Sequence, residues 1–178
     1  MTEDESLQRA IHEEVALVAH DPGWAQLFEA ERGRLLALFP QQLLGVEHVG
    51  STAIDGMPAK PVIDVLAGVA SMDVADALTG TLLGSGYTTS AEFNATLIDR
   101  RWFMRWAAGR RTHHLHVVVH HSDEWHRRLR FRDVLQADPV LAGRYASLKQ
   151  TLAIQHPADR EAYTAAKTAF VLELLGRA

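Results

Sequence analysis

The stretch "EHVGSTAIDGMPAKPVIDVLAG", residues 47–68, places one aspartate in a run that is otherwise apolar enough for a buried strand. The residues on either side of Asp64 are Pro-Val-Ile at 61–63 and Val-Leu-Ala at 65–67. Such a run can fill both faces of a strand that is covered on each side. Because a carboxylate loses hydration there, we expect a compensating polar or cationic partner close to Asp64.

Length and composition predict one soluble domain over residues 1–178. The chain has 178 residues with 47% hydrophobic content, which is enough for a core without covalent staples. The absence of cysteine excludes disulfides and thiolate metal sites. No apolar run approaches the ~20 residues of a membrane span, and no signal-peptide pattern opens the chain. We therefore expect a cytoplasmic protein that does not bind membranes, with a flexible polar segment over residues 1–14.

Hydrophobic periodicity predicts alternating helices and strands, an α/β chain. Asp21 and Pro22 resemble a cap and first-turn proline, and they predict a helix to about Phe39. Ser71 begins a second helical pattern, which ends at the glycines near 84–86. Strand patterns occupy residues 43–50, 62–69, 87–90, 99–109 and 113–120, and "GRR" at 109–111 predicts an antiparallel hairpin between the last two. Three further helices, beginning near Ser122, Asp138 and Pro157, predict a C-terminal helical cap.

The tripeptide Gly50-Ser51-Thr52 follows a strand and can form either an ordinary turn or a phosphate-binding loop. Glycine lets a ligand approach the backbone closely, and the N–H and hydroxyl groups can donate hydrogen bonds to phosphate. Asp64 lies thirteen residues after Ser51, where a hairpin-like return brings it back beside the loop. A phosphate loop beside a carboxylate indicates phosphate together with a divalent metal.

Two histidines offer further ligands. His114 and His116 are two residues apart, so both point to one face of a strand. With Asp64 they form either an imidazole and carboxylate metal set or a structural pair in which His116 bonds to the carboxyl. His48 is a further candidate for the same face.

Charge is unevenly distributed. Nine arginines and two acidic residues give residues 100–132 a net +7, while the whole chain carries −4 and the remainder therefore −11. Forked guanidinium groups match phosphates, so Arg128 and Arg132, four apart on one helix face, are candidate phosphate ligands. Lys60 is either an exposed lysine or a third such cation.

The motif at residues 47–69 resembles the signature of the GrpB family, and the resemblance continues through "HHLHVVV", "WHRRLRFRDVLQADPVLAGRYASLK" and "DREAYTAAKTAFV". It implies a polymerase-beta-like nucleotidyltransferase fold, with a mixed sheet flanked by helices. In that superfamily a Gly-Ser loop holds the triphosphate of a nucleotide, and two carboxylates one residue apart bind metal. Gly50, Ser51 and Asp64 match that pattern, but Leu66 stands where the second carboxylate is expected.

Three functions follow as hypotheses. The first is metal-dependent nucleotidyl transfer to a small molecule, with Asp64 as the catalytic carboxylate, Mg, Mn or Zn as cofactor and a nucleoside triphosphate as substrate. The second is a catalytically degenerate accessory domain that binds a nucleotide or another anion, which Leu66 favours. The third is nucleic-acid binding through the arginine-rich segment, which the overall acidity disfavours. The resemblance also implies relatives joined to a dephospho-coenzyme A kinase, but the chain lacks the Gly-x-x-x-x-Gly-Lys-Ser/Thr loop of such a kinase.

Overall fold

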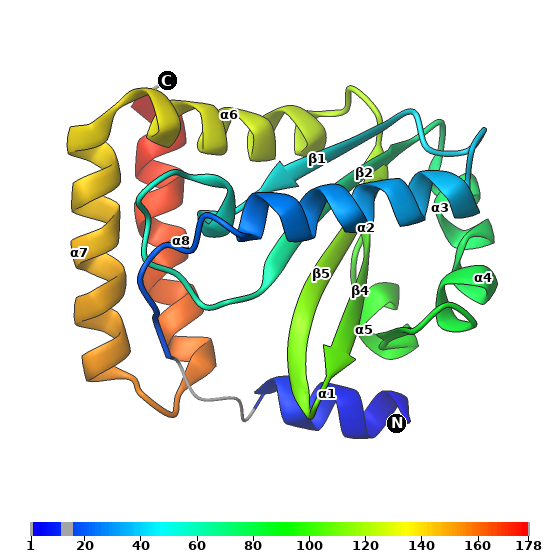
Figure 1. The fold of residues 1–178 in the computed structure, drawn as a ribbon, viewed down its shortest axis with the longest axis horizontal. Coiled ribbons are helices and arrows are strands. Elements are labelled where there is room, and N and C mark those ends of the chain that lie inside the picture. The colour runs from blue at the N-terminus through cyan, green and yellow to red at the C-terminus, as the bar shows by residue number, and fades with distance from the viewer. Residues whose placement is uncertain (1, 12–15, 178) are drawn as a thin grey trace.

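The computed structural model of the protein describes residues 2–11 and 16–177, and it has a mixed α+β fold (Figure 1). One five-stranded sheet has the strand order β1-β2-β5-β4-β3. Strands β2 and β5 are parallel, and the other neighbours are antiparallel. The strands are β1 (Gly45–Val49), β2 (Ile63–Val69), β3 (Tyr87–Thr89), β4 (Arg100–Ala107) and β5 (Arg110–Val119).

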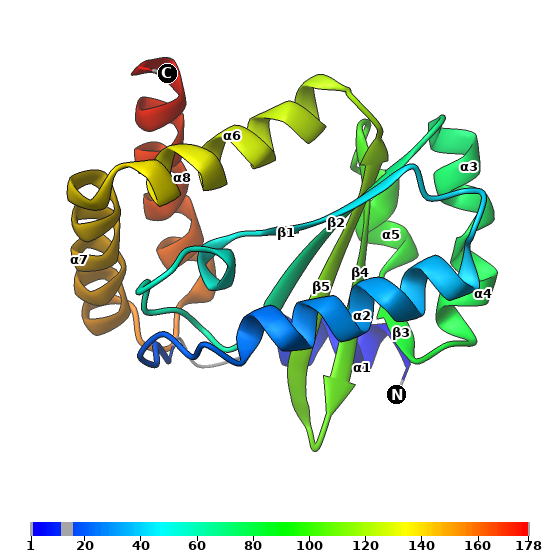
Figure 2. The same ribbon diagram turned by 45° about the horizontal axis from the view of Figure 1, so that its top comes forward.

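Helices flank the sheet, as Figures 1 and 2 show. The turn η1 (Ser51–Ala53) lies between β1 and β2. The helices are α1 (Glu3–Ile11), α2 (Trp24–Leu38), α3 (Met72–Ala77), α4 (Thr79–Leu83), α5 (Ala91–Ala95), α6 (Asp123–Ala137), α7 (Pro139–Gln155) and α8 (Arg160–Arg177).

The two faces of the sheet bury different clusters. On one face Val65, Leu115 and Phe103 pack with Phe28 and Leu35 of α2 and with residues of α3 and α4. On the other face Leu66 and Val118 pack against Trp125 of α6. Because side chains alternate along a strand, Asp64, His114 and His116 share this second face with Leu66. Asp64, His114 and His116 therefore face α6 rather than α2.

Local signals confirm most of the predicted elements. The β4–β5 hairpin closes through Ala108 and Gly109, both with positive φ (49° and 75°), as a two-residue loop requires. Ser71, Ser122 and Asp138 each accept hydrogen bonds from the backbone of the helix that follows them.

Some boundaries differ from the predicted ones. Helix α2 begins at Trp24, because Asp21 accepts a hydrogen bond from the Gly23 N–H and holds residues 22–23 in a turn. The single helix predicted from Ser71 is two short helices, α3 and α4. Of residues 1–14, for which the sequence predicts a flexible segment, residues 3–11 form α1, which contacts β3 and places Leu7 against Trp102 and Met104, while residues 1 and 12–14 lie outside the described part of the chain.

Candidate functional site

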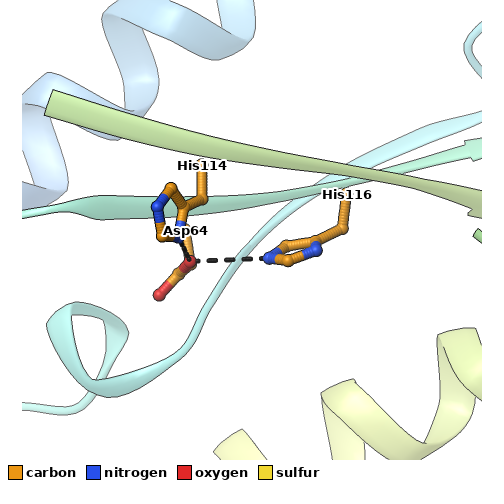
Figure 3. A group of neighbouring side chains, drawn as sticks. All are labelled: Asp64, His114 and His116. Atoms are coloured by element: carbon orange, nitrogen blue, oxygen red, sulfur yellow. Dashed lines mark ion pairs between the residues drawn. The ribbon is translucent and has the colours of Figure 1, made fainter. Parts of the chain in front are cut away.

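The register between β2 and β5 brings the three chemically active side chains together. Asp64 is the direct partner of His114, and His116 lies two residues further along β5 on the same face. His114 Nδ1 lies 3.3 Å from Asp64 Oδ1, and His116 Nε2 lies 3.6 Å from the same oxygen. Figure 3 shows all three on one side of the strands, facing away from the blue helix α2.

The turn after β1 approaches Asp64 from the other side. Gly50 has a φ of +73°, and a Cβ atom on it would lie 2.4 Å from Asp64 Oδ2. Only glycine combines this left-handed conformation with so close an approach. The predicted return of Asp64 to the Gly50-Ser51 loop is therefore confirmed.

A cavity of about 300 Å³ opens beside these residues. Its wall combines the Gly50–Thr52 turn, Asp64 and both histidines with side chains from the helical cap. Four of the lining side chains are cationic, namely Lys60, Arg128, Lys149 and Lys167. One carboxylate thus lies among four basic side chains, so basic groups outnumber acidic groups among the described lining residues.

The carboxyl of Asp64 is anionic at neutral pH. Burial raises its pKa, but the hydrogen-bonding approach of His114 and His116 outweighs burial and holds the pKa well below the usual value. Burial lowers the pKa of His116 to about 3, and the nearby charge of Arg128 adds to that decrease. His116 is therefore a neutral imidazole at neutral pH.

Arginines fix which nitrogen of each imidazole carries the proton. Arg111 Nη1 lies 2.6 Å from His114 Nε2, and Arg100 Nη1 lies 3.1 Å from His116 Nδ1. A guanidinium group can only donate, so both of these nitrogens accept. An imidazole that accepts on one nitrogen carries its proton on the other, so this contact pattern favours the tautomers in which both rings present an N–H to the Asp64 carboxylate.

The hydrogen bonds to His114 and His116 affect whether these residues can coordinate the predicted metal ion. One ligand atom each from Asp64, His114 and His116 lies within 4.8 Å of the others, a spacing that one metal ion can span. Metal binding requires a lone pair on the imidazole nitrogen that faces the ion, whereas here those nitrogens carry protons. The donor set does not fit a metal in this arrangement, since Arg100 and Arg111 would first have to release the imidazoles.

The structure places most of the predicted site residues around the cavity and two outside it. The predicted residues that line it are Gly50, Ser51, Thr52, Lys60, Asp64, His114, His116 and Arg128. Arg128 is held by Glu124 Oε1 at 2.7 Å. His48 and Arg132 are absent from the wall. Whether the lining residues bind phosphate or metal stays a prediction.

Packing explains the two exceptions. His48 stacks on Phe28 of α2, with ring centroids 4.7 Å apart, and its Nε2 lies 2.9 Å from Thr52 Oγ1. The β1–β2 register pairs Val49 with Asp64, which leaves His48 on the opposite face. Arg132 donates to Glu47 Oε2 and to the His48 carbonyl, and so it ties α6 to β1.

The sequence reasoning missed the residues that the C-terminal helices contribute. Helix α7 brings Tyr145 and Lys149 to the cavity, and α8 brings Tyr163 and Lys167. Tyr145 lines the cavity together with Ser51, and the Ser51 hydroxyl acts against the burial that raises the Tyr145 pKa, so the helical cap lies beside the glycine-serine turn. The residues of each pair, 145 and 149 or 163 and 167, are four positions apart, and this spacing is the signal that would have placed each pair on one helix face.

With this geometry in view, comparison with known proteins gives the family. The family model described as GrpB protein matches residues 14–177. The chain belongs to the GrpB family. A glutamate-rich protein GrpB from Alkalihalophilus pseudofirmus is 38% identical over 170 residues, covering 91% of this chain and 94% of the relative. The crystal structure of conserved protein GrpB from Enterococcus faecalis has a TM-score of 0.82 and 32% identity, covering 91% of this chain and 96% of the other.

Other relatives of this GrpB chain are longer. The UPF0157 protein YqkA of Bacillus subtilis is 34% identical over 157 residues, and this chain spans 45% of its length. A protein named dephospho-CoA kinase from Mycobacterium bovis is 31% identical over 185 residues, again with 45% of its length covered. Among the residues that the structure describes, no helix is both long and apolar enough to cross a lipid bilayer.

Proposed function

We propose that the cavity binds a small molecule carrying phosphate, with nucleotides as the first class to consider. One observation carries this proposal. Four cationic side chains and the Gly50–Thr52 turn surround a single carboxylate in a cavity of about 300 Å³. A phosphate group matches the excess of positive charge, and the volume is at the lower end of that of small-molecule sites.

The lining residues are proposed to make different contacts with the ligand. Arg128 is oriented by its ion pair with Glu124 and can fork onto phosphate oxygens. Ser51 carries a hydroxyl that lies in the cavity wall beside Tyr145 and can donate a hydrogen bond to phosphate. Asp64, an anion with two imidazole donors, remains able to accept a hydrogen bond from a ligand hydroxyl or to take its proton.

The proposal includes the nucleotidyltransferase-like fold and a cytoplasmic location. The supporting feature is the antiparallel β1–β2 pair, whose connecting turn begins with glycine and serine and whose second strand opens with the carboxylate. Without a second carboxylate at the fully buried Leu66, ligand binding without transfer is the simpler function.

Metal-dependent nucleotidyl transfer is the second candidate. The observation in its favour is the convergence of three donor groups within 4.8 Å. The arginine contacts to both imidazoles and the single carboxylate stand against it. The two candidates therefore differ in whether binding depends on a divalent cation.

A thermal-shift panel separates them. Nucleotides are tested alone and with Mg²⁺, Mn²⁺ or Zn²⁺ on the wild type, on Asp64→Asn and on Asp73→Asn, a control on the exposed surface of α3. Stabilisation by nucleotide without metal supports the binding function. Stabilisation only with metal, lost in Asp64→Asn but kept in the control, supports transfer, and pyrophosphate release then confirms it. If no phosphate compound raises the melting temperature of the wild type, the proposal is wrong.

The panel also includes dephospho-coenzyme A and coenzyme A. These compounds are included because the mycobacterial relative, of which the chain spans less than half, is named a dephospho-CoA kinase. Because this sequence has no Gly-x-x-x-x-Gly-Lys-Ser/Thr loop, we propose no kinase activity for it but retain an accessory role as a binding domain.

A further inference from the structure

Lys149 is a buried basic side chain in the cavity wall. Only 1% of its surface is exposed, and its amine donates to the Pro58 carbonyl and lies 5.2 Å from the ring centroid of Tyr145. An ammonium group can donate three hydrogen bonds, and a buried one needs an anion or several acceptors to offset its desolvation. One carbonyl and one aromatic face supply only part of that.

Tyr163 presents a second unsatisfied group in the same wall. Its side chain is fully buried, and its hydroxyl has no hydrogen-bond partner among the residues that the structure describes. A buried hydroxyl without a partner is destabilising, and an acceptor on a ligand would satisfy it. Lys167 links the two residues, since its ammonium lies 5.0 Å from the Tyr163 ring centroid and its charge acts on Lys149.

The charged and titratable groups of the cavity wall come from six parts of the fold, including α7 with Lys149 itself. The loop before β2 supplies Lys60, β2 supplies Asp64, β5 supplies the two histidines, α6 supplies Arg128, and α8 supplies Lys167 and Tyr163. Tyr145 lies on α7, the helix that also carries Lys149, and its ring faces the Lys149 amine. Among the described residues that line the cavity, Asp64 is the only carboxylate, and its two imidazole contacts already occupy one of its oxygens.

We propose that Lys149 and Tyr163 form a buried anion subsite, and that an anion entering it brings one proton onto the Lys149 amine. This inference rests on the proposed anion-binding function and deepens it. The amine gains the proton from solvent, and the ammonium so formed pairs with the anion while Tyr163 donates its hydroxyl proton in a hydrogen bond. Lys149 acts as a binding residue, and no covalent bond changes.

The electrostatics give the coupling its direction. Burial, and then the charge of Lys167, lower the pKa of Lys149 to about 7, while Asp64 opposes them. An anion beside the amine raises that pKa again, so binding above pH 7 takes up a proton. For one linked proton, the dissociation constant of the anion increases about tenfold per pH unit above 7.

Sulfate is the probe, because it stays a dianion throughout the pH range of the experiment. Its dissociation constant is measured from pH 6 to pH 9 by titration calorimetry, at constant ionic strength. The wild type is expected to bind tightest below pH 7 and to weaken about tenfold per unit above it. Lys149→Met fills the same space without charge and should bind at least tenfold more weakly at pH 6, with a flat pH profile.

Two further variants sharpen the test. Lys149→Arg keeps a charge that does not titrate, so it should bind sulfate with a flat profile at the low-pH affinity. Arg144→Met, which removes a charge from the exposed face of the same helix, should retain the wild-type profile. Circular dichroism and the melting temperature establish that each variant is folded.

The outcomes separate this inference from the function on which it rests. If the wild type binds sulfate with an affinity that Lys149→Met does not change, or with no pH dependence between 7 and 9, the Lys149 subsite is refuted while anion binding stands. If neither sulfate nor any phosphate compound binds, both ideas are refuted together.

Discussion

Gly50 approaches Asp64 so closely that a Cβ atom on it would lie 2.4 Å from the carboxylate Oδ2 and 3.1 Å from the Asp64 Cβ. The same residue has a φ of +73°, a conformation that other L-residues rarely adopt. The contact joins the glycine-serine turn to the one acidic side chain that the sequence singles out.

Replacing Gly50 by alanine should therefore displace Asp64 as well as strain the backbone. Gly56→Ala is the matched control, because Gly56 has nearly the same φ, +74°, with no atom within 4 Å of an added Cβ. Backbone strain costs each variant about 1 kcal/mol, and Gly50→Ala should lose at least as much again through the carboxylate. Urea unfolding measures both. Equal losses would mean that the approach to Asp64 is easily relieved.

The arginine contacts predict the tautomer of each imidazole. Long-range ¹H–¹⁵N correlation spectra at pH 7 should show the proton of His114 on Nδ1 and that of His116 on Nε2, because Arg111 and Arg100 donate to the opposite nitrogens. Arg100→Met should release His116 alone and leave the His114 signals in place. Spectra with the protons on the far nitrogens would instead leave lone pairs facing Asp64, and a metal could then bind without rearrangement.

Stability should fall in two separate acid ranges. The pKa of His116, about 3, lies below its unfolded value, so the unfolded chain takes up a proton that the folded protein does not. The stability that this shift contributes is fully present above pH 6.5 and is lost as the pH falls toward 3, by up to about 1.4 kcal/mol per pH unit.

The Asp64 contribution is lost only at lower pH. Its lowered pKa contributes stability that is present above pH 3.8 and disappears as the carboxylate takes up its proton. Urea unfolding between pH 7 and pH 3 should therefore give a shallower slope for His116→Gln than for the wild type from pH 6.5 downward. Asp64→Asn should leave that upper slope nearly unchanged. A wild type whose stability is constant from pH 7 to pH 5 would contradict the low pKa of His116.

Two tyrosines in the cavity wall predict opposite effects of removing one oxygen atom. The Tyr145 hydroxyl interacts with Ser51, so Tyr145→Phe should lower the free energy of unfolding by about 1 kcal/mol. The Tyr163 hydroxyl is buried without a partner among the described residues, so Tyr163→Phe should leave stability unchanged or increase it. Thermal denaturation compares the two, and weaker anion binding by Tyr163→Phe at full stability would support a ligand contact. A large loss of stability in Tyr163→Phe would show that its hydroxyl already has a partner.

Many residues of the candidate site could be predicted because they are recognised by residue type and by spacing within a few positions of the sequence. A lone carboxylate in an apolar strand, a glycine-serine turn and two histidines at strand spacing each follow from residue type and period. The prediction that His48 lies on the same sheet face as Asp64 was wrong. Alternation shows which residues of one strand share a face, but it does not show which of these faces matches a given face of the neighbouring strand. Only the pairing of Val49 with Asp64 decides that His48 faces α2.

Arg132 shows the same limit on a helix. Its spacing from Arg128 places both on one face of α6, but the next turn of that helix lies over β1, where Glu47 and the His48 carbonyl accept its guanidinium. Arg128 and Arg132 therefore share a helix face, but only Arg128 lines the cavity.

The sequence by itself determined the strands, most of the helices, the capping residues Ser71, Ser122 and Asp138, and the need for a compensating partner near Asp64, because these depend on sterics and hydration within a few residues. Tertiary structure alone decided how the two histidines contact Asp64 and which further basic side chains complete the cavity wall. Lys149, Tyr163 and Lys167 reach the cavity only because α7 and α8 dock beside the sheet, and docking depends on packing between residues far apart in the chain.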